Sequence, residues 1–347
     1  MPDLSAEVAI VGAGPIGIEL AVALKKAEIE YLHFDARQIG YTISWFAPQT
    51  RFFSSNERIA IAGVPLATPD QGKCTREQYL AYLRAVVEQF SLKINTYEPV
   101  VNIQREGDVF QLTTRQGGGK GEELKYRVRK LVLASGGTDR PRPIDVRGID
   151  LPHVSRYFQD PHTYFQQDLL IVGGRNSAVE AALRCHYAGA RVTISYRNPQ
   201  LDSTSIKYWL WPEINGLIQS GKMKSHFNST LTEIYPGRAF LRGKDGGDIN
   251  VPADFVLILI GYEADMKLLR MAGVELREPG QIPVYDPTTM QTNVPGIYVA
   301  GTAIAGTQGK YAVFIENCHV HTDRILASLT GKAPPEGPSV GFERPES

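Results

Sequence analysis

Cysteine is scarce in this chain of 347 residues, and neither charge sign is in excess. Its three cysteines, Cys74, Cys185 and Cys318, are too few and too widely spaced for a disulfide framework or a structural zinc site, and no CxxC pair occurs. Lysine plus arginine and aspartate plus glutamate number 37 each, which argues against a broad nucleic-acid or anionic-membrane surface. The apolar residues 8–11 are too few to span a bilayer and follow no basic segment, so we expect a cytoplasmic protein without a membrane or nucleic-acid partner.

One motif occurs twice. Residues 9–19 read AIVGAGPIGIE, and residues 170–180 read LIVGGRNSAVE. Each copy predicts a short apolar strand, a small-residue turn and an apolar-periodic helix, and a second strand follows at 31–35 or 191–196. This is the pattern of a βαβ unit, and the length of the chain suits two domains that each contain one.

Glycine-rich turns between a strand and a helix are typical of dinucleotide-binding sites. The first glycine makes the tight turn, the second lets the backbone approach a pyrophosphate, and the third lets helix and strand pack closely. After the first motif, Asp35 ends the second strand, and a carboxylate there accepts hydrogen bonds from free ribose hydroxyls. Tyr196 and Arg197 stand at the corresponding place after the second motif, and they suit a 2′-phosphate, so we predict NADPH rather than NADH there.

The remaining chain predicts more strands and a last helix. The expected elements are an antiparallel meander over 100–113 and 124–128 with a glycine turn at 117–119, strands at 131–137, 255–260 and 296–302, and a helix from about Ala312 to Leu329.

In this order, the pieces resemble the flavoproteins with two dinucleotide-binding domains that include the low-molecular-weight thioredoxin reductases. The resemblance implies FAD in the first site and an inserted NADPH domain. Residues 134–137 match the family's ATG segment, and Gly301-Thr302 matches its GD segment beside the flavin, with Thr302 in place of the usual aspartate.

We therefore expect an α/β protein with two Rossmann-like, three-layer ββα domains. The FAD-binding domain would comprise residues 1–158 and 285–347, and the NADPH-binding domain would comprise residues 159–284.

Three stretches are similar to the bacillithiol disulfide reductase branch of these flavoproteins: 50–58 with 63–65, 205–213, and 313–317 with His321. This likeness implies an enzyme that reduces a low-molecular-weight disulfide without a CxxC pair. The branch carries a loop cysteine, proposed to take part in thiol exchange, where this chain has Ile16, which cannot form a mixed disulfide.

The electron acceptor therefore stays open. The alternatives to a small disulfide are oxygen, as in a flavin monooxygenase or NADPH oxidase, and a ferredoxin-type carrier. A redox-sensing protein that binds FAD and NADPH with little turnover is a third alternative. Proteins of this family commonly pair, so a homo-oligomer, a dimer or larger, is left open as well.

The motifs and the resemblance together assign residues to sites. The expected FAD site comprises Gly12, Ala13, Gly14, Pro15, Ile16, Gly17, Asp35, Ala36, Tyr41, Val101, Ala134, Ser135, Gly136, Gly301 and Thr302. The expected NADP site comprises Gly173, Gly174, Arg175, Asn176, Ser177, Ala178, Tyr196, Arg197 and Gly261. Candidates for a carboxylate-bearing substrate are Arg51, Arg58 and Lys207, with surface charge as the alternative, and candidate catalytic residues are Cys318, His319 and His321, with packing as the alternative. No spacing predicts a metal site.

The assignment of Arg197 is testable. We expect Arg197→Ala to weaken NADPH binding about tenfold or more, and to leave NADH binding nearly unchanged, because only NADPH carries the 2′-phosphate. Dissociation constants of both nucleotides for the purified variant check this, and equal weakening of the two would refute the assignment.

Overall fold

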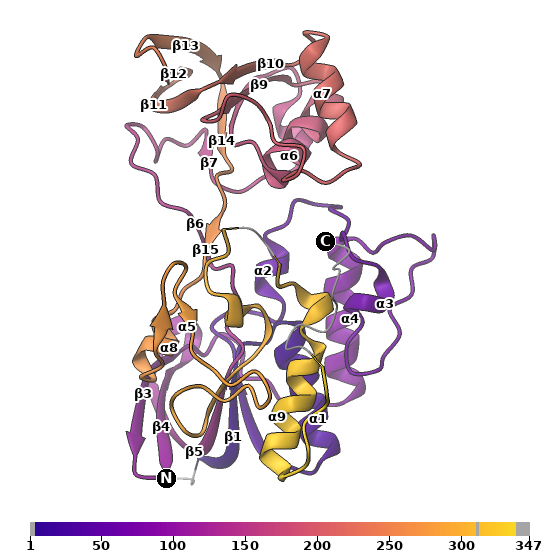
Figure 1. Ribbon diagram of the computed structural model, residues 1–347, viewed down its shortest axis with the longest axis vertical. Helices are drawn as coiled ribbons and strands as arrows, with labels where there is room; N and C mark the ends of the chain where they lie inside the picture. The colour runs from indigo at the N-terminus through magenta and orange to yellow at the C-terminus, as the bar shows by residue number, and fades with distance from the viewer. Residues whose placement is uncertain (1–3, 310–311, 338–347) are drawn as a thin grey trace. The chain divides into compact units, whose positions relative to one another are not determined.

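The computed structural model describes residues 4–309 and 312–337, which form two compact units (Figure 1). The first unit takes in the described residues up to Trp45, then Gln49–Arg140, then those from Glu263 onward. The second takes in Phe46–Pro48 and Pro141–Tyr262, so it is inserted in the chain of the first.

The borders between the units differ from the expected ones. They fall at 140/141 and 262/263, where we expected 158/159 and 284/285. Strand β7 (Val154–Ser155) pairs with β14 (Phe255–Ile258), which draws the segment before residue 158 into the second unit. Helix α8 (Lys267–Met271) packs against the core of the first unit and draws the segment after residue 262 into that one.

A six-stranded sheet forms the centre of the first unit, in the order β2-β1-β5-β4-β3, with β18 also on β5. Its strands are β1 (Ser5–Val11), β2 (Tyr31–Phe34), β3 (Val100–Glu106), β4 (Val109–Arg115), β5 (Glu123–Leu133) and β18 (Ile297–Val299). The first half of β5 pairs antiparallel with β4, and its last three residues pair parallel with β18. The segments 124–128 and 131–137, expected as two strands, are therefore parts of one strand, which ends at Leu133.

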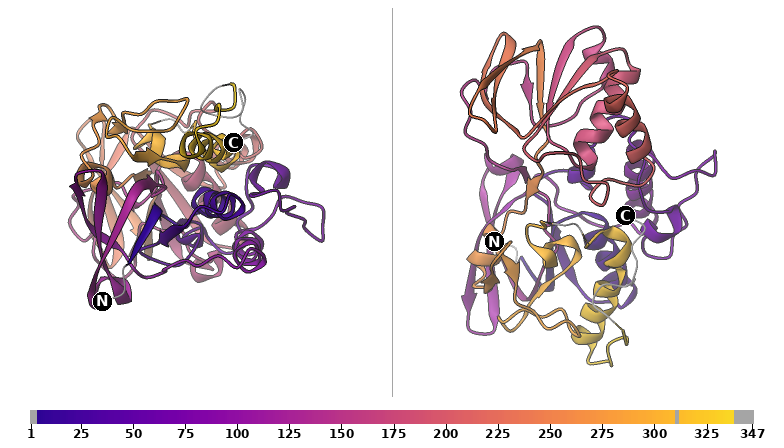
Figure 2. Two further views of the ribbon diagram at one scale, coloured as in Figure 1. Left: turned by 90° about the horizontal axis from the view of Figure 1, so that it is seen from below. Right: turned by 45° about the horizontal axis from the view of Figure 1, so that its top comes forward.

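Helix α1 (Pro15–Lys26) connects β1 with β2 and completes the first predicted βαβ unit. Helix α9 (His319–Thr330) lies beside α1, as Figures 1 and 2 show. Apolar side chains of both helices join the sheet in one hydrophobic core, which includes the fully buried Ile10, Leu20 and Ile325.

Helix α4 (Arg76–Gln89) starts at a capping box formed by Thr75 and Gln78. Thr75 Oγ1 accepts a hydrogen bond from the Gln78 N–H, and Gln78 Oε1 accepts one from the Thr75 N–H. Short elements complete the first unit: α2 (Tyr41–Ser44), α3 (Asn56–Ile59), α5 (Gln116–Gly119), the 3₁₀ turns Gly301–Ala305 and Ile315–Asn317, and the strand pair β16 (Leu276–Arg277) and β17 (Ile282–Pro283). The strand pair β6 (Arg140–Pro141) and β15 (Tyr262–Glu263) stands at the borders of the two units.

The expected last helix starts later than predicted. It begins at His319 instead of near Ala312, because the Asn317 side chain binds the preceding backbone. Its Oδ1 accepts from the Phe314 N–H at 2.9 Å, and its Nδ2 donates to the Ala312 carbonyl at 2.8 Å. These bonds hold a 3₁₀ turn where the apolar pattern suggested a helix.

The second unit is built around a parallel sheet in the order β10-β9-β8-β14-β7. Its further strands are β8 (Asp168–Val172), β9 (Arg191–Tyr196) and β10 (Lys224–Phe227), and helix α6 (Asn176–Tyr187) connects β8 with β9 as the second predicted βαβ unit. Helix α7 (Trp211–Gln219) lies beside α6 (Figures 1 and 2), and a 3₁₀ turn covers Pro161–Tyr164. An antiparallel sheet of β11 (Ser229–Tyr235), β12 (Gly237–Gly243) and β13 (Asp248–Ala253) completes the unit.

The alternation of side chains along β8 separates the layers of the second unit. Leu169 and Ile171 point into a core with helix α6, whereas Leu170 and Val172 point into a core with the antiparallel sheet. Both faces of the parallel sheet are covered, which explains why β8 is apolar from Leu169 to Val172. Of the helices in the described ranges, none is long and apolar enough to cross a membrane.

Candidate functional site

Three segments of the expected FAD site meet at the carboxyl edge of the first sheet. Strands β1, β5 and β18 run parallel, and Leu133 of β5 pairs with Val11 on one side and Val299 on the other. The segments that follow these strands, 12–17, 134–137 and 300–302, therefore lie together. Open α/β sheets bind ligands at this edge.

The first loop requires glycine at two positions. A Cβ on Gly12, which has φ of +113°, would stand 2.3 Å from the Ala134 carbonyl oxygen, and a Cβ on Gly17 would stand 2.0 Å from the Gly12 carbonyl oxygen. Gly14 differs, since no atom lies within 4 Å of the place its Cβ would take. Pro15 then starts α1, whose first turn no side chain caps. The open backbone at Gly14 and the N–H groups of this turn fit a pyrophosphate.

The Asp35 carboxylate lies against the first loop. Its Oδ2 accepts a hydrogen bond from the Ala13 N–H at 2.6 Å, and its Oδ1 accepts one from the Arg37 N–H at 2.7 Å. Burial raises the pKa of Asp35 overall, although both hydrogen bonds and the Arg37 charge act to lower it. A carboxylate has about four acceptor positions, so the group can also accept from ribose hydroxyls.

Two other expected FAD residues, Ala36 and Tyr41, follow Asp35 in the chain, and a third, Val101, lies in β3. Ala36 is exposed, and Tyr41 starts α2 with the Arg37 guanidinium 5.6 Å from its ring centroid. Val101 lies in β3, three residues after Glu98, whose N–H donates to the Asp35 carbonyl at 2.9 Å.

Thr302 takes the place where the family usually has aspartate. Its Oγ1 accepts a hydrogen bond from the Gly137 N–H at 2.9 Å, which ties the turn after β18 to the turn after β5. Ser135 lies in the turn after β5, and its Oγ is buried without a hydrogen-bond partner among the described residues. Buried hydroxyls normally have a partner, so this one fits a bound polar group. Ile16 packs here too, with its Cβ 3.5 Å from the position of a Cβ on Gly301.

Two buried histidines hold the loop backbone. His33 Nε2 lies 3.0 Å from the Gly12 carbonyl oxygen, which only accepts, so this nitrogen carries the proton. Burial lowers the pKa of His33 to about 4 against the raising effect of that hydrogen bond, so the ring is neutral. His321 Nδ1 accepts a hydrogen bond from the Gly301 N–H at 3.0 Å, so this ring holds the backbone of the turn after β18.

His319 connects α1, α3 and α9. Its Nδ1 lies 2.8 Å from Glu19 Oε2, and its Nε2 lies 2.8 Å from the Arg58 carbonyl oxygen. Both partners are acceptors, so a protonated ring, which donates from both nitrogens, satisfies both contacts. Burial by itself lowers the pKa of His319, but Glu19 and the Arg58 carbonyl raise it overall. Occupation of both N–H groups favours the packing alternative for this residue.

The three thiols are buried. Burial raises the pKa of Cys74 and of Cys185 to about 12, and it also raises the pKa of Cys318, which caps α9, with Glu19 adding to that shift. Thiolates are the reactive form, so burial favours packing as the role of each cysteine. Within 4–309 and 312–337, no group of three or more His, Cys, Asp and Glu side chains could hold a metal ion.

The second loop has the same close approach between backbone atoms at its first glycine, Gly173. Gly173 has φ of +144°, and a Cβ there would stand 2.3 Å from the Leu259 carbonyl oxygen. Ala178 takes the place of the third glycine at the start of α6. Arg175 is the N-cap residue of α6, Ser177 lies in its first turn, and the Asn176 Oδ1 accepts a hydrogen bond from the Lys207 N–H at 2.8 Å.

Tyr196 lies over the second loop. A Cβ on Gly174 would stand 2.5 Å from the Tyr196 ring, so the glycine makes room for this ring. Arg197 is exposed and follows β9 directly. Gly261, with φ of +98°, follows the neighbouring strand β14, and its carbonyl accepts from the Arg142 N–H at 3.0 Å.

Each of the expected substrate cations has a charged or aromatic partner. Arg51 pairs with Asp70 at 2.9 Å, and Arg58 lies 3.8 Å from the buried Glu316. Lys207 has its Nζ 5.9 Å from the Trp209 ring centroid. Their roles toward a substrate remain predictions.

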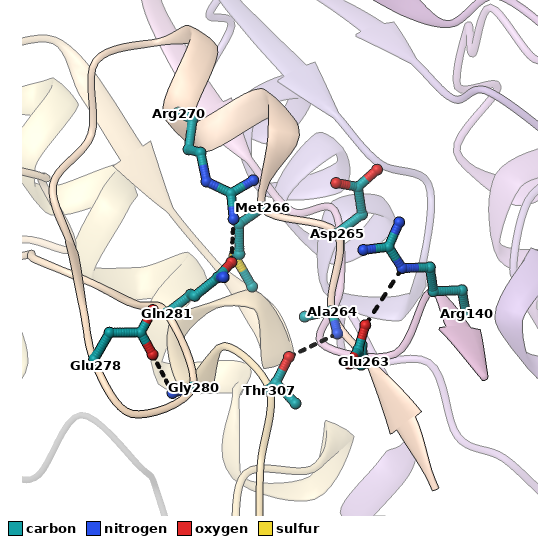
Figure 3. A pocket seen from close by; sticks show the side chains of 10 residues that line it. All are labelled: Arg140, Glu263, Ala264, Asp265, Met266, Arg270, Glu278, Gly280, Gln281 and Thr307. Carbon is teal, nitrogen blue, oxygen red and sulfur yellow. Dashed lines mark hydrogen bonds and ion pairs between the residues drawn. The ribbon is translucent and has the colours of Figure 1, made fainter. Parts of the chain in front are cut away.

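A polar cavity of about 220 Å³ lies elsewhere in the first unit (Figure 3). Arg140 pairs with Glu263 at 3.5 Å in its wall, and Arg270 donates to Gln281. None of the residues expected at either cofactor site lines this cavity.

Sequence patterns missed the contact of His319 with Glu19. Glu19 is the last matching residue of the repeated motif, which was its only signal. The pair lies 300 positions apart, so no local spacing relates the two.

Gly14 offers a test of the first site. We expect Gly14→Val to abolish FAD binding and the yellow colour while the protein stays folded, because the new side chain meets the cofactor and no protein atom. The absorbance spectrum and a thermal melt of the purified variant measure both effects. Gly12→Val is the control that should fail to fold, and a Gly14→Val protein with full flavin content would refute the first site.

His319 gives a pH-dependent term in stability. Its pKa is raised in the folded chain, so the stabilisation is fully present below its ordinary value of about 6.5 and is lost as pH rises through the folded value. We expect His319→Gln to lower the free energy of unfolding by about 1.5–3 kcal/mol at low pH and to remove this loss. Urea denaturation between about pH 5.5 and 8.5 measures it. The exposed His162→Gln is the control, and an unchanged pH profile in His319→Gln would contradict the ion pair.

The chain is similar to known proteins over nearly its whole length. The family model for "Pyridine nucleotide-disulphide oxidoreductase" matches residues 9–301. The "Bacilliredoxin reductase Bdr" of Bacillus subtilis is 32% identical over 92% of this chain and 96% of its own. The solved "Bacillithiol Disulfide Reductase Bdr (YpdA)" from Bacillus cereus aligns with a TM-score of 0.88 at 34% identity, over 94% of this chain and 99% of that one.

A "Ferredoxin--NADP reductase" of Ignicoccus hospitalis is 28% identical over 90% of this chain and 97% of its own. The fold of this chain is therefore shared with the Bacillus cereus structure. The chain belongs to the pyridine nucleotide-disulphide oxidoreductase family and is an FAD-dependent, NADPH-oxidising enzyme of that family.

Proposed function

We propose that this enzyme reduces a low-molecular-weight disulfide of the bacillithiol class, by NADPH + H⁺ + RSSR → NADP⁺ + 2 RSH. The Bacillus relatives support this class of substrate, since their names state bacilliredoxin and bacillithiol disulfide as the partners of those proteins. Free cysteines at every position also suit the reducing cytoplasm, where we place the reaction, and a homo-oligomer remains part of the proposal.

The first unit would hold FAD and the second NADPH. In the first unit, the N–H groups at the start of α1 would bind the pyrophosphate, Asp35 the ribose hydroxyls, and Ser135 a polar atom of the flavin. In the second unit, α6 and Arg197 would hold the phosphates of NADPH. When bound, FAD accepts a hydride from NADPH and delivers the electron pair to the acceptor.

The burial of all three thiols carries the mechanistic part of the proposal. The chain has no CxxC dithiol for exchange, and Ile16 stands at the loop position where the related branch has cysteine. The disulfide would then receive electrons without a mixed disulfide to this chain. The residues around Gly301 and Thr302 would position the flavin for this step.

Reduction of a ferredoxin-type carrier is the second candidate. The Ignicoccus relative supports it, and a carrier needs no protein thiol either. The two functions differ in the acceptor that reoxidises the flavin, which a kinetic experiment separates.

Anaerobic stopped-flow absorbance tests the proposal. NADPH is mixed with the flavin-loaded protein first, and bacillithiol disulfide follows. We expect rapid bleaching of the flavin band and rapid recovery that depends on the disulfide. Cys318→Ala should recover at the wild-type rate, because no thiol takes part.

Parallel arms use air-saturated buffer and a ferredoxin. Bleaching followed by recovery only with ferredoxin would establish the carrier reductase, and recovery only with oxygen would establish an oxidase. Loss of disulfide-dependent recovery in Cys318→Ala, with its flavin content unchanged, would refute the thiol-free route.

A further inference from the structure

A second cavity, of about 340 Å³, lies in the second unit beside the end of β9. Its wall consists of Arg197, Asn228, Thr230, Arg242, Gly243 and Lys244. Three of these six residues are cationic, and none carries a carboxylate. The cavity is therefore suited to an anion with two negative charges.

Strand pairing builds this cavity from distant segments. Strand β9 pairs parallel with β10, so Arg197 and Asn228, which follow these two strands, lie near each other. β11 begins next and pairs antiparallel with β12, which sets Thr230 opposite Arg242. The antiparallel sheet thus places its own cations beside the end of β9. In a Rossmann-type unit, this strand end binds the adenine ribose.

The charges around the cavity are only partly neutralised. Arg242 pairs with Asp248 at 2.7 Å, and both side chains are about half exposed. Asp245, the other carboxylate of this hairpin, accepts from the Gly247 N–H at 3.1 Å. Arg197 and Lys244 make no side-chain hydrogen bond or ion pair with any described residue.

Arg197 is the only cation that directly follows β9, since Asn198, Pro199 and Gln200 come next. One guanidinium does not balance a phosphate dianion in a wall open to solvent. The other two cations of this wall, Arg242 and Lys244, come from the β12–β13 hairpin.

We propose that Lys244 and Arg242 complete the subsite for the adenosine 2′-phosphate of NADPH together with Arg197. The hairpin is then a specificity element that selects NADPH over NADH, and Thr230 and Asn228 supply neutral donors to the same phosphate. This inference rests on the assignment of NADPH to the second unit.

Binding of fragments to the flavin-loaded protein tests the proposal apart from turnover. Calorimetry gives the dissociation constants of adenosine 2′,5′-bisphosphate and of 5′-AMP. We expect Lys244→Ala to weaken the bisphosphate about tenfold and to leave 5′-AMP unchanged. Asp248→Asn should tighten the bisphosphate severalfold, because it releases Arg242 from its ion pair. The exposed Lys222→Ala should change neither ligand.

The outcomes distinguish a failure of the NADPH assignment from a failure of the proposal for the hairpin. If the unaltered protein binds both fragments equally, its preference for NADPH is wrong. If it prefers the bisphosphate and both hairpin variants keep that preference, the hairpin has no part in the subsite and only the cofactor assignment stands. Equal weakening of both fragments by Lys244→Ala would also overturn the proposal, since it would indicate a general loss of structure or charge.

Discussion

Both nucleotide loops depend on one close approach between backbone atoms. Gly12 and Gly173 each turn beside the carbonyl oxygen that follows the neighbouring parallel strand, and in each case a Cβ would stand 2.3 Å from that oxygen. Only glycine can occupy such a position. The approach keeps the loop against the sheet edge and aims the following helix N-terminus at the space above it. All other features of each site are placed relative to this turn.

Polar side chains then hydrogen-bond to the backbone of the turns at the first site. His33 holds the Gly12 carbonyl, Asp35 the Ala13 N–H, and His321 the Gly301 N–H. These backbone groups lie in turns, so no neighbouring residue of a regular helix or strand binds them. The three side chains bind them instead and keep the turns from collapsing. The neutral state of His33 matters here, because an imidazolium buried beside this turn would be costly. A preorganised backbone is the form of support that a bound pyrophosphate needs.

Much of this could be predicted from local sequence. The repeated motif identified both βαβ units, because strand, turn and helix are each encoded within a few residues. Contacts between distant segments left no such trace. The late start of α9 depends on the Asn317 side chain, and the single strand β5 depends on partners from two parts of the chain. The cations of the β12–β13 hairpin likewise meet Arg197 only after the strands pair. The roles of individual cofactor residues remain predictions, since local patterns identify the kind of site but not each contact.

The burial of the cysteines has a consequence for the chemical environment of the enzyme. Burial raises the pKa of Cys74 and Cys185 to about 12, so both thiols are protonated at neutral pH. Small disulfides, peroxides and alkylating agents react with thiolates, and these thiols are also shielded from contact. An enzyme with this arrangement would keep working under the oxidative conditions that create its substrates. Its resistance to oxidation would come from the absence of a reactive cysteine thiolate.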